Sequence, residues 1–177
     1  NFRKISDETI SVWSEILKKI ENSSLILKSS EFCSEEILME KFKINGVNNK
    51  IKIFNKIDFK KKNDHLNLYK KVDLSLDTFP YNGVTTTFES LWMNVPVLVL
   101  KGFNFNSRCG ESIIKNTKLD YFIAKNKTEY IEKALNLSQN KESLVMYRKK
   151  IYETILSSPL FDTRKFTQNF QNLLLKL

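Results

Sequence analysis

Residues 72–100 read VDLSLDTFPYNGVTTTFESLWMNVPVLVL, and this stretch sets the fold class. The run 96–100 is uninterrupted and apolar, which is typical of a strand buried on both faces of a parallel sheet. Residues 72–77 predict a second strand, followed by a turn over 78–83. Thr85 to Trp92 then continues as a helix. A strand, a turn, a helix and a further buried strand together predict a parallel α/β unit.

The flanking sequence repeats this alternation. Further strands are expected at 24–27, 50–54 and 121–123, and apolar residues at three- and four-residue steps predict a helix that Ser6 opens. We predict a doubly wound, Rossmann-like parallel sheet in a single domain, residues 1–177, with 141–177 as a C-terminal helical extension. The other predicted helices lie at 34–44, 60–70, 108–116, 128–138, 141–156 and 163–177, and the first of these ends at Asn45-Gly46.

Composition excludes several classes of protein. The 177 residues are 41% hydrophobic and 12% aromatic, too apolar for a disordered chain, and no run is long enough for a membrane helix. Two cysteines are too few for a disulfide scaffold and indicate a reducing compartment, so we expect a cytoplasmic protein. The net charge of +9 comes with many Lys, Asn and Ile residues, as an AT-rich genome would produce, so we expect no nucleic-acid partner.

The sequence begins at Asn1 without an initiator methionine. We therefore expect it to be a piece of a longer protein.

Ligands of doubly wound sheets bind outside the carboxyl ends of the strands, which here are followed by 28–32, 56–62, 77–86 and 101–108. Thr85 and Thr86 stand at a helix start, where N–H groups and hydroxyls can bind phosphate. The alternative is that the threonines only cap the helix, with Thr86 and Glu89 forming a capping box. Neither a P-loop nor a dinucleotide Gly-x-Gly-x-x-Gly pattern is present.

Three other positions are ambiguous from the residues alone. Glu89 is either a capping partner or an acceptor for ribose hydroxyls. His65, the single histidine, is either a surface residue or part of a site with the lysines at 60–62. Arg108 either steadies the loop over 101–107 or faces a bound anion. We find no set of His, Cys and carboxylates with metal-ligand spacing.

Taken together, these segments resemble glycosyltransferase family 41, the O-linked N-acetylglucosamine transferases with their plant SPINDLY and bacterial relatives. The resemblance runs in order along nearly the whole chain, as the C-terminal half of a catalytic region. The segments that carry it are 4–6, 21–23, 76–83, 85–87, 91–92, 95–97, 107–108 and 157–161.

The resemblance implies roles for residues around a donor diphosphate. Lys4 matches a lysine that holds the diphosphate and stabilises it as it leaves, and Asn1 lies where the family has a polar donor-site residue. Thr85 and Thr86 match hydroxyls on the same diphosphate. The family has two Rossmann-like domains in the GT-B arrangement and works without a metal ion.

The resemblance also implies a nucleoside site. Lys62 and His65 match a Lys-x-x-His pair that packs around the nucleoside, and Glu89 matches the acidic residue that takes the ribose hydroxyls. Val84 departs from the family, whose members have His or Thr at this position. The departure concerns the identity of the transferred sugar more than the binding of the nucleotide.

The resemblance therefore implies the donor-binding domain of an inverting glycosyltransferase that transfers a sugar from a UDP-sugar to protein Ser or Thr. We expect the sugar to be N-acetylglucosamine. The acceptor side would be in an N-terminal half preceded by tetratricopeptide repeats, so we expect this piece alone to be inactive. Alternatives are a relative that uses UDP-glucose or GDP-fucose with another acceptor, and a non-catalytic basic α/β binding module.

Overall fold

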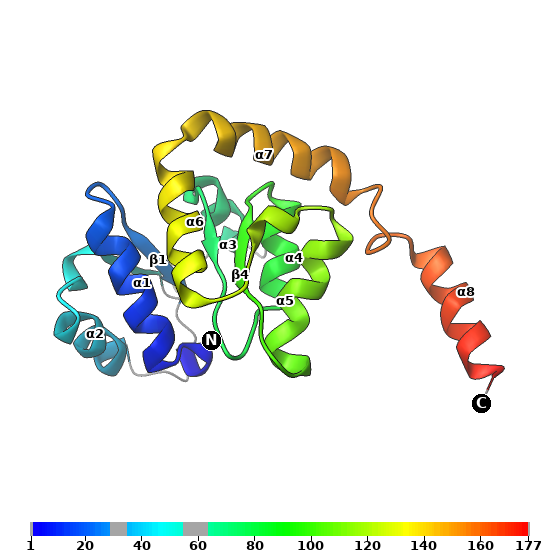
Figure 1. The fold of residues 1–177 in the computed structure, drawn as a ribbon, viewed down its shortest axis with the longest axis horizontal. Helices are drawn as coiled ribbons and strands as arrows, with labels where there is room; N and C mark the ends of the chain where they lie inside the picture. Colours follow the sequence, from blue (N-terminus) through cyan, green and yellow to red (C-terminus); the bar gives the residue numbers. More distant parts are fainter. Residues whose placement is uncertain (1, 29–34, 55–63, 177) are drawn as a thin grey trace.

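The structure is a computed structural model that describes residues 2–28, 35–54 and 64–176. Strands and helices alternate along the chain (Figure 1). The described strands are β1 (Leu25–Lys28), β2 (Ile51–Phe54), β3 (Ser75–Leu76), β4 (Val97–Leu100) and β5 (Ile123–Ala124). The described helices are α1 (Asp7–Lys19), α2 (Glu35–Ile44), α3 (Asp64–Asn67), α4 (Thr85–Trp92), α5 (Phe105–Asn116), α6 (Lys127–Gln139), α7 (Lys141–Ile155) and α8 (Thr163–Leu174).

Every described strand pairing is parallel. β1 pairs with β2, and β4 lies between β3 and β5. Hydrogen-bonded ladders thus form two groups in the described residues. Leu27 of β1 and Leu98 of β4 nevertheless belong to one hydrophobic cluster with α1 and α6, so a common core joins both groups. The predicted α/β class with parallel strands is confirmed.

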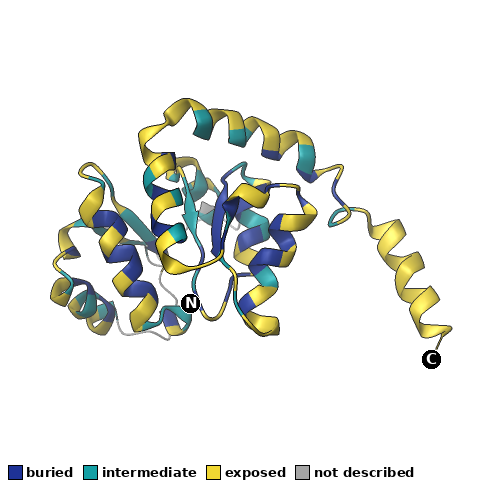
Figure 2. Ribbon diagram, in the orientation of Figure 1, coloured by how far each residue is buried: buried dark blue, intermediate teal, exposed yellow. Residues whose placement is uncertain are grey.

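β4 is buried on both faces, as its apolar sequence predicts (Figure 2). Leu98 packs into the cluster with α1 and α6, whereas Val97 and Val99 pack into a second cluster with α4, α5 and α7. Burying an aliphatic side chain of this size contributes about 1.5–3 kcal/mol to folding. β4 therefore holds the two cores together.

Three predicted boundaries were wrong. The strand predicted at 121–123 lies at Ile123–Ala124, because Asp120–Phe122 form a 3₁₀ helix. β3 contains only Ser75 and Leu76, not 72–77, because the carbonyl of Val72 accepts a hydrogen bond from Arg148 Nη1 of α7 (2.8 Å) and does not join the ladder. α5 begins at Phe105, three residues before the predicted start. Its N-cap is Asn104, whose side chain accepts from the N–H of Ser107 in a capping box, so part of the predicted polar loop is helical.

The helix predicted at 60–70 falls partly outside the described residues. Its described part is α3, followed by a 3₁₀ helix, Leu68–Lys71. The N-terminal helix begins as predicted, because the Ser6 side chain accepts from the N–H of Thr9. Gly46 has a φ of 71°, the left-handed conformation expected after α2.

The two last helices differ in burial. α7 packs Ile151 and Ile155 into the second cluster. α8 extends away from the other elements and has no buried residue (Figures 1 and 2). No helix among the described residues combines the length and the apolar character needed to cross a membrane. The assignment of 1–177 to one domain with an extension at 141–177 stays a prediction.

Candidate functional site: the start of α4 and the loops around it

The turn between β3 and α4 is organised by Asp77. Its Oδ1 accepts hydrogen bonds from the N–H groups of Gly83 (2.7 Å) and Thr78 (2.9 Å). Burial is the main reason why the pKa of Asp77 rises to about 7, although these bonds and the charge of Lys4 act in the opposite direction. A side chain at position 83 would bring its Cβ to 2.5 Å from Thr86 Oγ1, so the turn requires glycine.

Among the described residues, the N-cap side chain does not close the start of α4. Its N-cap residue is Val84, which makes no side-chain cap hydrogen bond. The capping interpretation and the predicted capping box of Thr86 with Glu89 are wrong, because Glu89 instead contacts residues of the segment over 64–71. Thr85 and Thr86 are exposed and Thr87 is buried. A helix start of this kind offers N–H groups and hydroxyls to an anion.

Lys4 lies beside this turn. Its Nζ donates to the carbonyl oxygen of Asn82 (3.2 Å) and stands 4.0 Å from the centre of the Tyr81 ring. The hydroxyls of Ser6 and Thr9 both donate to the carbonyl of Phe79, at 2.8 and 2.7 Å, which fixes the N-terminal segment against the turn. The structure thus brings a cation next to the exposed start of α4.

His65 and Glu89 form a pair one turn further along α4. Nε2 of His65 lies 3.3 Å from Oε1 of Glu89, and the Tyr69 hydroxyl lies 3.4 Å from Oε2. The pair borders a hollow of about 360 Å³, which is also lined by Leu66, Phe88, Trp92 and Phe161. Asn1 and Lys62, the other two predicted site residues, lie outside the described residues.

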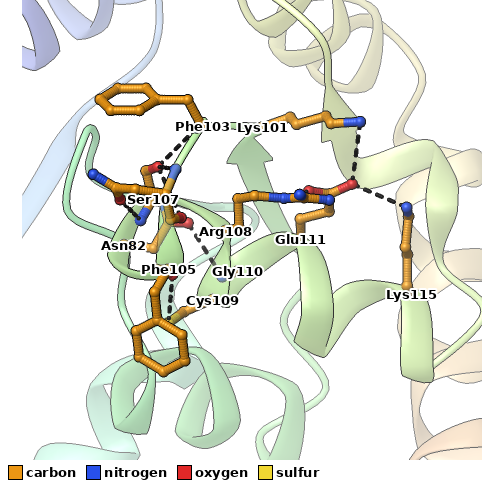
Figure 3. A network of polar contacts seen from close by, with 11 residues as sticks. Asn82, Lys101, Phe103, Phe105, Ser107, Arg108, Cys109, Gly110, Glu111 and Lys115 are labelled. Atoms are coloured by element: carbon orange, nitrogen blue, oxygen red, sulfur yellow. Dashed lines mark hydrogen bonds and ion pairs between the residues drawn. The ribbon is translucent and has the colours of Figure 1, made fainter.

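The first turns of α5, which follow the loop after β4, are joined to the same turn through Asn82, which is fully buried. The Asn82 N–H donates to the carbonyl of Asn106 (3.1 Å), and its Oδ1 accepts from the N–H of Gly110 (3.2 Å; Figure 3). Ser107 Oγ accepts from the N–H groups of Phe103 and Asn104, at 2.9 and 3.0 Å. These bonds make one unit of the two loops.

Arg108 turns out to bind a side chain of its own helix. Its Nε donates to Oε2 of Glu111 (2.9 Å), and Lys101 and Lys115 complete a cluster of three cations around this buried carboxylate (Figure 3). Burial opposes ionisation of Glu111, but hydrogen bonds from Arg108 and Lys115 and the nearby charges lower its pKa to about 2. Arg108 thus contacts Glu111 within α5, and both interpretations, support of the loop over 101–107 and contact with a bound anion, stay predictions.

Sequence reasoning missed Asp77, Asn82, Tyr69 and Glu111 as organising residues. Asp77 and Asn82 stand in the quoted turn, where a buried acid or amide at a strand end is a usable signal. The roles of Tyr69 and Glu111 depend on contacts across elements, which no local pattern reveals. In the described ranges, no group of three or more His, Cys, Asp or Glu residues is placed to hold a metal ion.

The fold and these loops define a Rossmann-like α/β domain with an uncapped helix start at the carboxyl edge of its strands. Residues 1–170 match the model of glycosyl transferase family 41. The chain therefore belongs to glycosyltransferase family 41, an enzyme family, as the sequence resemblance implied.

Relatives agree with this assignment. The chain is 34% identical over 98% of its length to the probable UDP-N-acetylglucosamine–peptide N-acetylglucosaminyltransferase SPINDLY of Solanum lycopersicum, and 31% identical over 98% to the protein of the same description named SEC from Arabidopsis thaliana. A variant of the O-GlcNAc transferase of Thermobaculum terrenum superposes with a TM-score of 0.88 at 27% identity over 97% of the chain.

Coverage of these relatives is partial. The chain spans 19% of the length of the tomato protein, 18% of the SEC protein and 33% of the solved bacterial chain. The fold prediction, a part of a GT-B glycosyltransferase, is confirmed by the bacterial structure.

Proposed function

We propose that this chain is the donor-binding domain of an inverting glycosyltransferase that transfers N-acetylglucosamine from a UDP-sugar to protein Ser or Thr. The observation that carries the proposal is the contact of Lys4 with Asn82, in the turn that leads into α4, together with the exposed Thr85 and Thr86 at the start of that helix. The relatives are named for transfer of N-acetylglucosamine from UDP-N-acetylglucosamine to peptides, which gives the donor and acceptor classes.

The proposed chemistry is stabilisation of the leaving group. As the bond between the sugar C1 and the diphosphate oxygen breaks, negative charge grows on the diphosphate. The Lys4 ammonium, the N–H groups at the start of α4 and the hydroxyls of Thr85 and Thr86 would stabilise that charge. These groups belong to the protein itself, so we propose a reaction without a metal cofactor, with the UDP-sugar as donor substrate.

Nucleoside recognition would fall to the pair of His65 and Glu89, one turn further along α4. Glu89 would accept hydrogen bonds from the ribose hydroxyls, and His65 would contact the nucleoside. Both side chains are partly exposed at the rim of the hollow, which leaves them accessible to a ligand. We keep Asn1 and Lys62 as proposed donor-site residues on the family resemblance alone.

The acceptor side is proposed to belong to a second, N-terminal half of the same protein. The chain spans about a fifth of its plant relatives, and it presents the exposed apolar residues Phe166, Phe170, Leu173 and Leu174 on α8. An apolar helix face of this kind is suited to packing against another domain. We therefore expect the isolated chain to bind donor nucleotide but to transfer no sugar.

Because Cys109 is a free thiol, we propose the reducing cytoplasm as the location of the protein.

The test is a calorimetric titration of the chain with UDP and with GDP. We expect saturable UDP binding that Thr86→Ala weakens about tenfold, the loss expected for one hydrogen bond to a charged group. Thr128→Ala is the matched control, because Thr128 is exposed at the second position of α6 as Thr86 is at that of α4. Selective GDP binding would favour a GDP-fucose donor, and no binding of either nucleotide at millimolar concentration would contradict a donor site.

A further inference from the structure

Tyr69 is placed between the two parts of the proposed donor site. It belongs to the 3₁₀ helix Leu68–Lys71, and its hydroxyl lies 3.4 Å from Oε2 of Glu89 and 3.3 Å from the carbonyl oxygen of Thr86. Burial, and then the charge of Glu89 and the hydrogen bond to it, raises the pKa of the Tyr69 phenol. The phenol therefore keeps its single proton, which it donates to one of these two oxygens at a time or shares between them.

The Glu89 carboxylate is held at both oxygens by one segment. Oε1 faces Nε2 of His65, and Oε2 faces the hydroxyl of Tyr69. Two donors on different oxygens restrict the rotation of the carboxylate as well as its position. A carboxylate has about four acceptor sites, and the described residues occupy two of the sites on Glu89, which leaves two for hydroxyl groups of a ligand. The Glu89 side chain is 29% exposed, so those sites are reachable from solvent.

We infer that Tyr69 is a positioning residue that holds Glu89 toward the hydroxyls of a ribose and thereby makes the site prefer ribonucleotides to their deoxy analogues. The inference rests on the proposed donor-binding function. The contact of Tyr69 with the Thr86 carbonyl connects this preference to the start of α4, where the diphosphate is proposed to bind. Without the phenol oxygen, the carboxylate keeps only its His65 partner among the described residues and is free to rotate.

The experiment compares UDP with 2′,3′-dideoxy-UDP on the wild-type chain and on Tyr69→Phe. We expect the wild type to prefer UDP, and Tyr69→Phe to lose about tenfold in affinity for UDP while its affinity for the dideoxy analogue hardly changes. Tyr152→Phe on α7, where the ring is 63% exposed, is the control and should leave both affinities unchanged. If the chain selects GDP, the same comparison is made with GDP and its dideoxy analogue.

A double variant separates positioning from general support of the fold. Glu89→Gln alone should also reduce the preference for UDP over the dideoxy analogue. If Tyr69 acts through Glu89, adding Tyr69→Phe to the Glu89→Gln variant should cause no further loss of affinity for UDP. Equal losses for UDP and the dideoxy analogue, or no loss at all, would overturn the inference while leaving the donor site in place. A wild-type chain that binds no nucleotide would overturn the proposed function, and this inference with it.

Discussion

The Nζ of Lys4 lies 3.2 Å from the carbonyl oxygen of Asn82, a residue 78 positions later in the chain. This contact places the positive charge of Lys4 against the turn that leads into α4. The charge therefore adds to the partial positive charge of the helix start. The proposed diphosphate site depends on both.

Lys4→Ala should weaken UDP binding about tenfold and leave uridine binding unchanged, because only UDP carries the charged groups that Lys4 would contact. Calorimetric titration with both ligands measures this difference. Lys149→Ala, at an exposed position of α7, is the control for the loss of one positive charge. Equal losses for UDP and uridine would contradict a contact between Lys4 and the diphosphate.

His65 offers a direct signal of nucleoside binding, because it is the single histidine of the sequence. Addition of UDP should shift its ring signals in a proton NMR spectrum, since the ring lies at the rim of the hollow beside Glu89. Pyrophosphate, which has no nucleoside, should leave these signals in place. Ring signals that stay unchanged at saturating UDP would argue against His65 as a site residue.

Asp77 makes stability depend on pH in a specific window. Its pKa is raised from 3.8 to about 7, so its contribution to stability is fully present below its unfolded value and is lost as the pH rises through about 7. Each unit of difference corresponds to about 1.4 kcal/mol. Asp77→Asn keeps the oxygen that accepts from Gly83 and should lose this pH dependence, which urea unfolding at pH 5 and pH 8 would reveal. If the free energy of unfolding of Asp77→Asn depended on pH as it does in the wild type, another group would be responsible for the pH dependence.

Glu111 has the opposite dependence. Its pKa is lowered to about 2, so its stabilising effect is present above the unfolded value and is lost as the pH falls toward 2. Glu111→Gln should destabilise the protein by about 1.5 kcal/mol at pH 7, because it removes the carboxylate that three half-exposed cations contact. In urea unfolding, the difference in free energy of unfolding between wild type and Glu111→Gln should become smaller as the pH is lowered. Glu132→Gln, exposed on α6, should change little at any pH, and a similar loss there would contradict a special role for Glu111.

The apolar face of α8 should contribute little to the stability of this chain. Phe166 and Phe170 stack on each other at 6.1 Å and are 68% and 55% exposed. Phe170→Glu should therefore change the free energy of unfolding by less than about 0.5 kcal/mol and reduce self-association, measured by thermal unfolding and sedimentation. Phe122→Ala, in the second core, should cost about 3–5 kcal/mol. A large loss from Phe170→Glu would show that α8 packs on the rest of the chain.

Local sequence patterns were sufficient for much of the fold. The apolar run over 96–100 predicted a strand buried on both sides, because a strand between two layers places consecutive apolar side chains away from water, and β4 covers 97–100. Ser6 and Asn45-Gly46 marked helix ends through hydrogen bonds and backbone conformations that involve near neighbours. The position of the candidate site followed from the same source, because a parallel sheet places the loops after its strands at one edge.

The tertiary structure decided what individual side chains contact. Glu89 has the spacing of a capping partner for Thr86, yet it contacts His65 and Tyr69, because packing brings their segment against α4. Arg108 contacts Glu111 of its own helix. Lys4 contacts Asn82, which lies 78 positions later in the chain. Sequence patterns report near neighbours along the chain. Contacts such as these depend on the relative placement of whole elements, which the shared core around β4 determines.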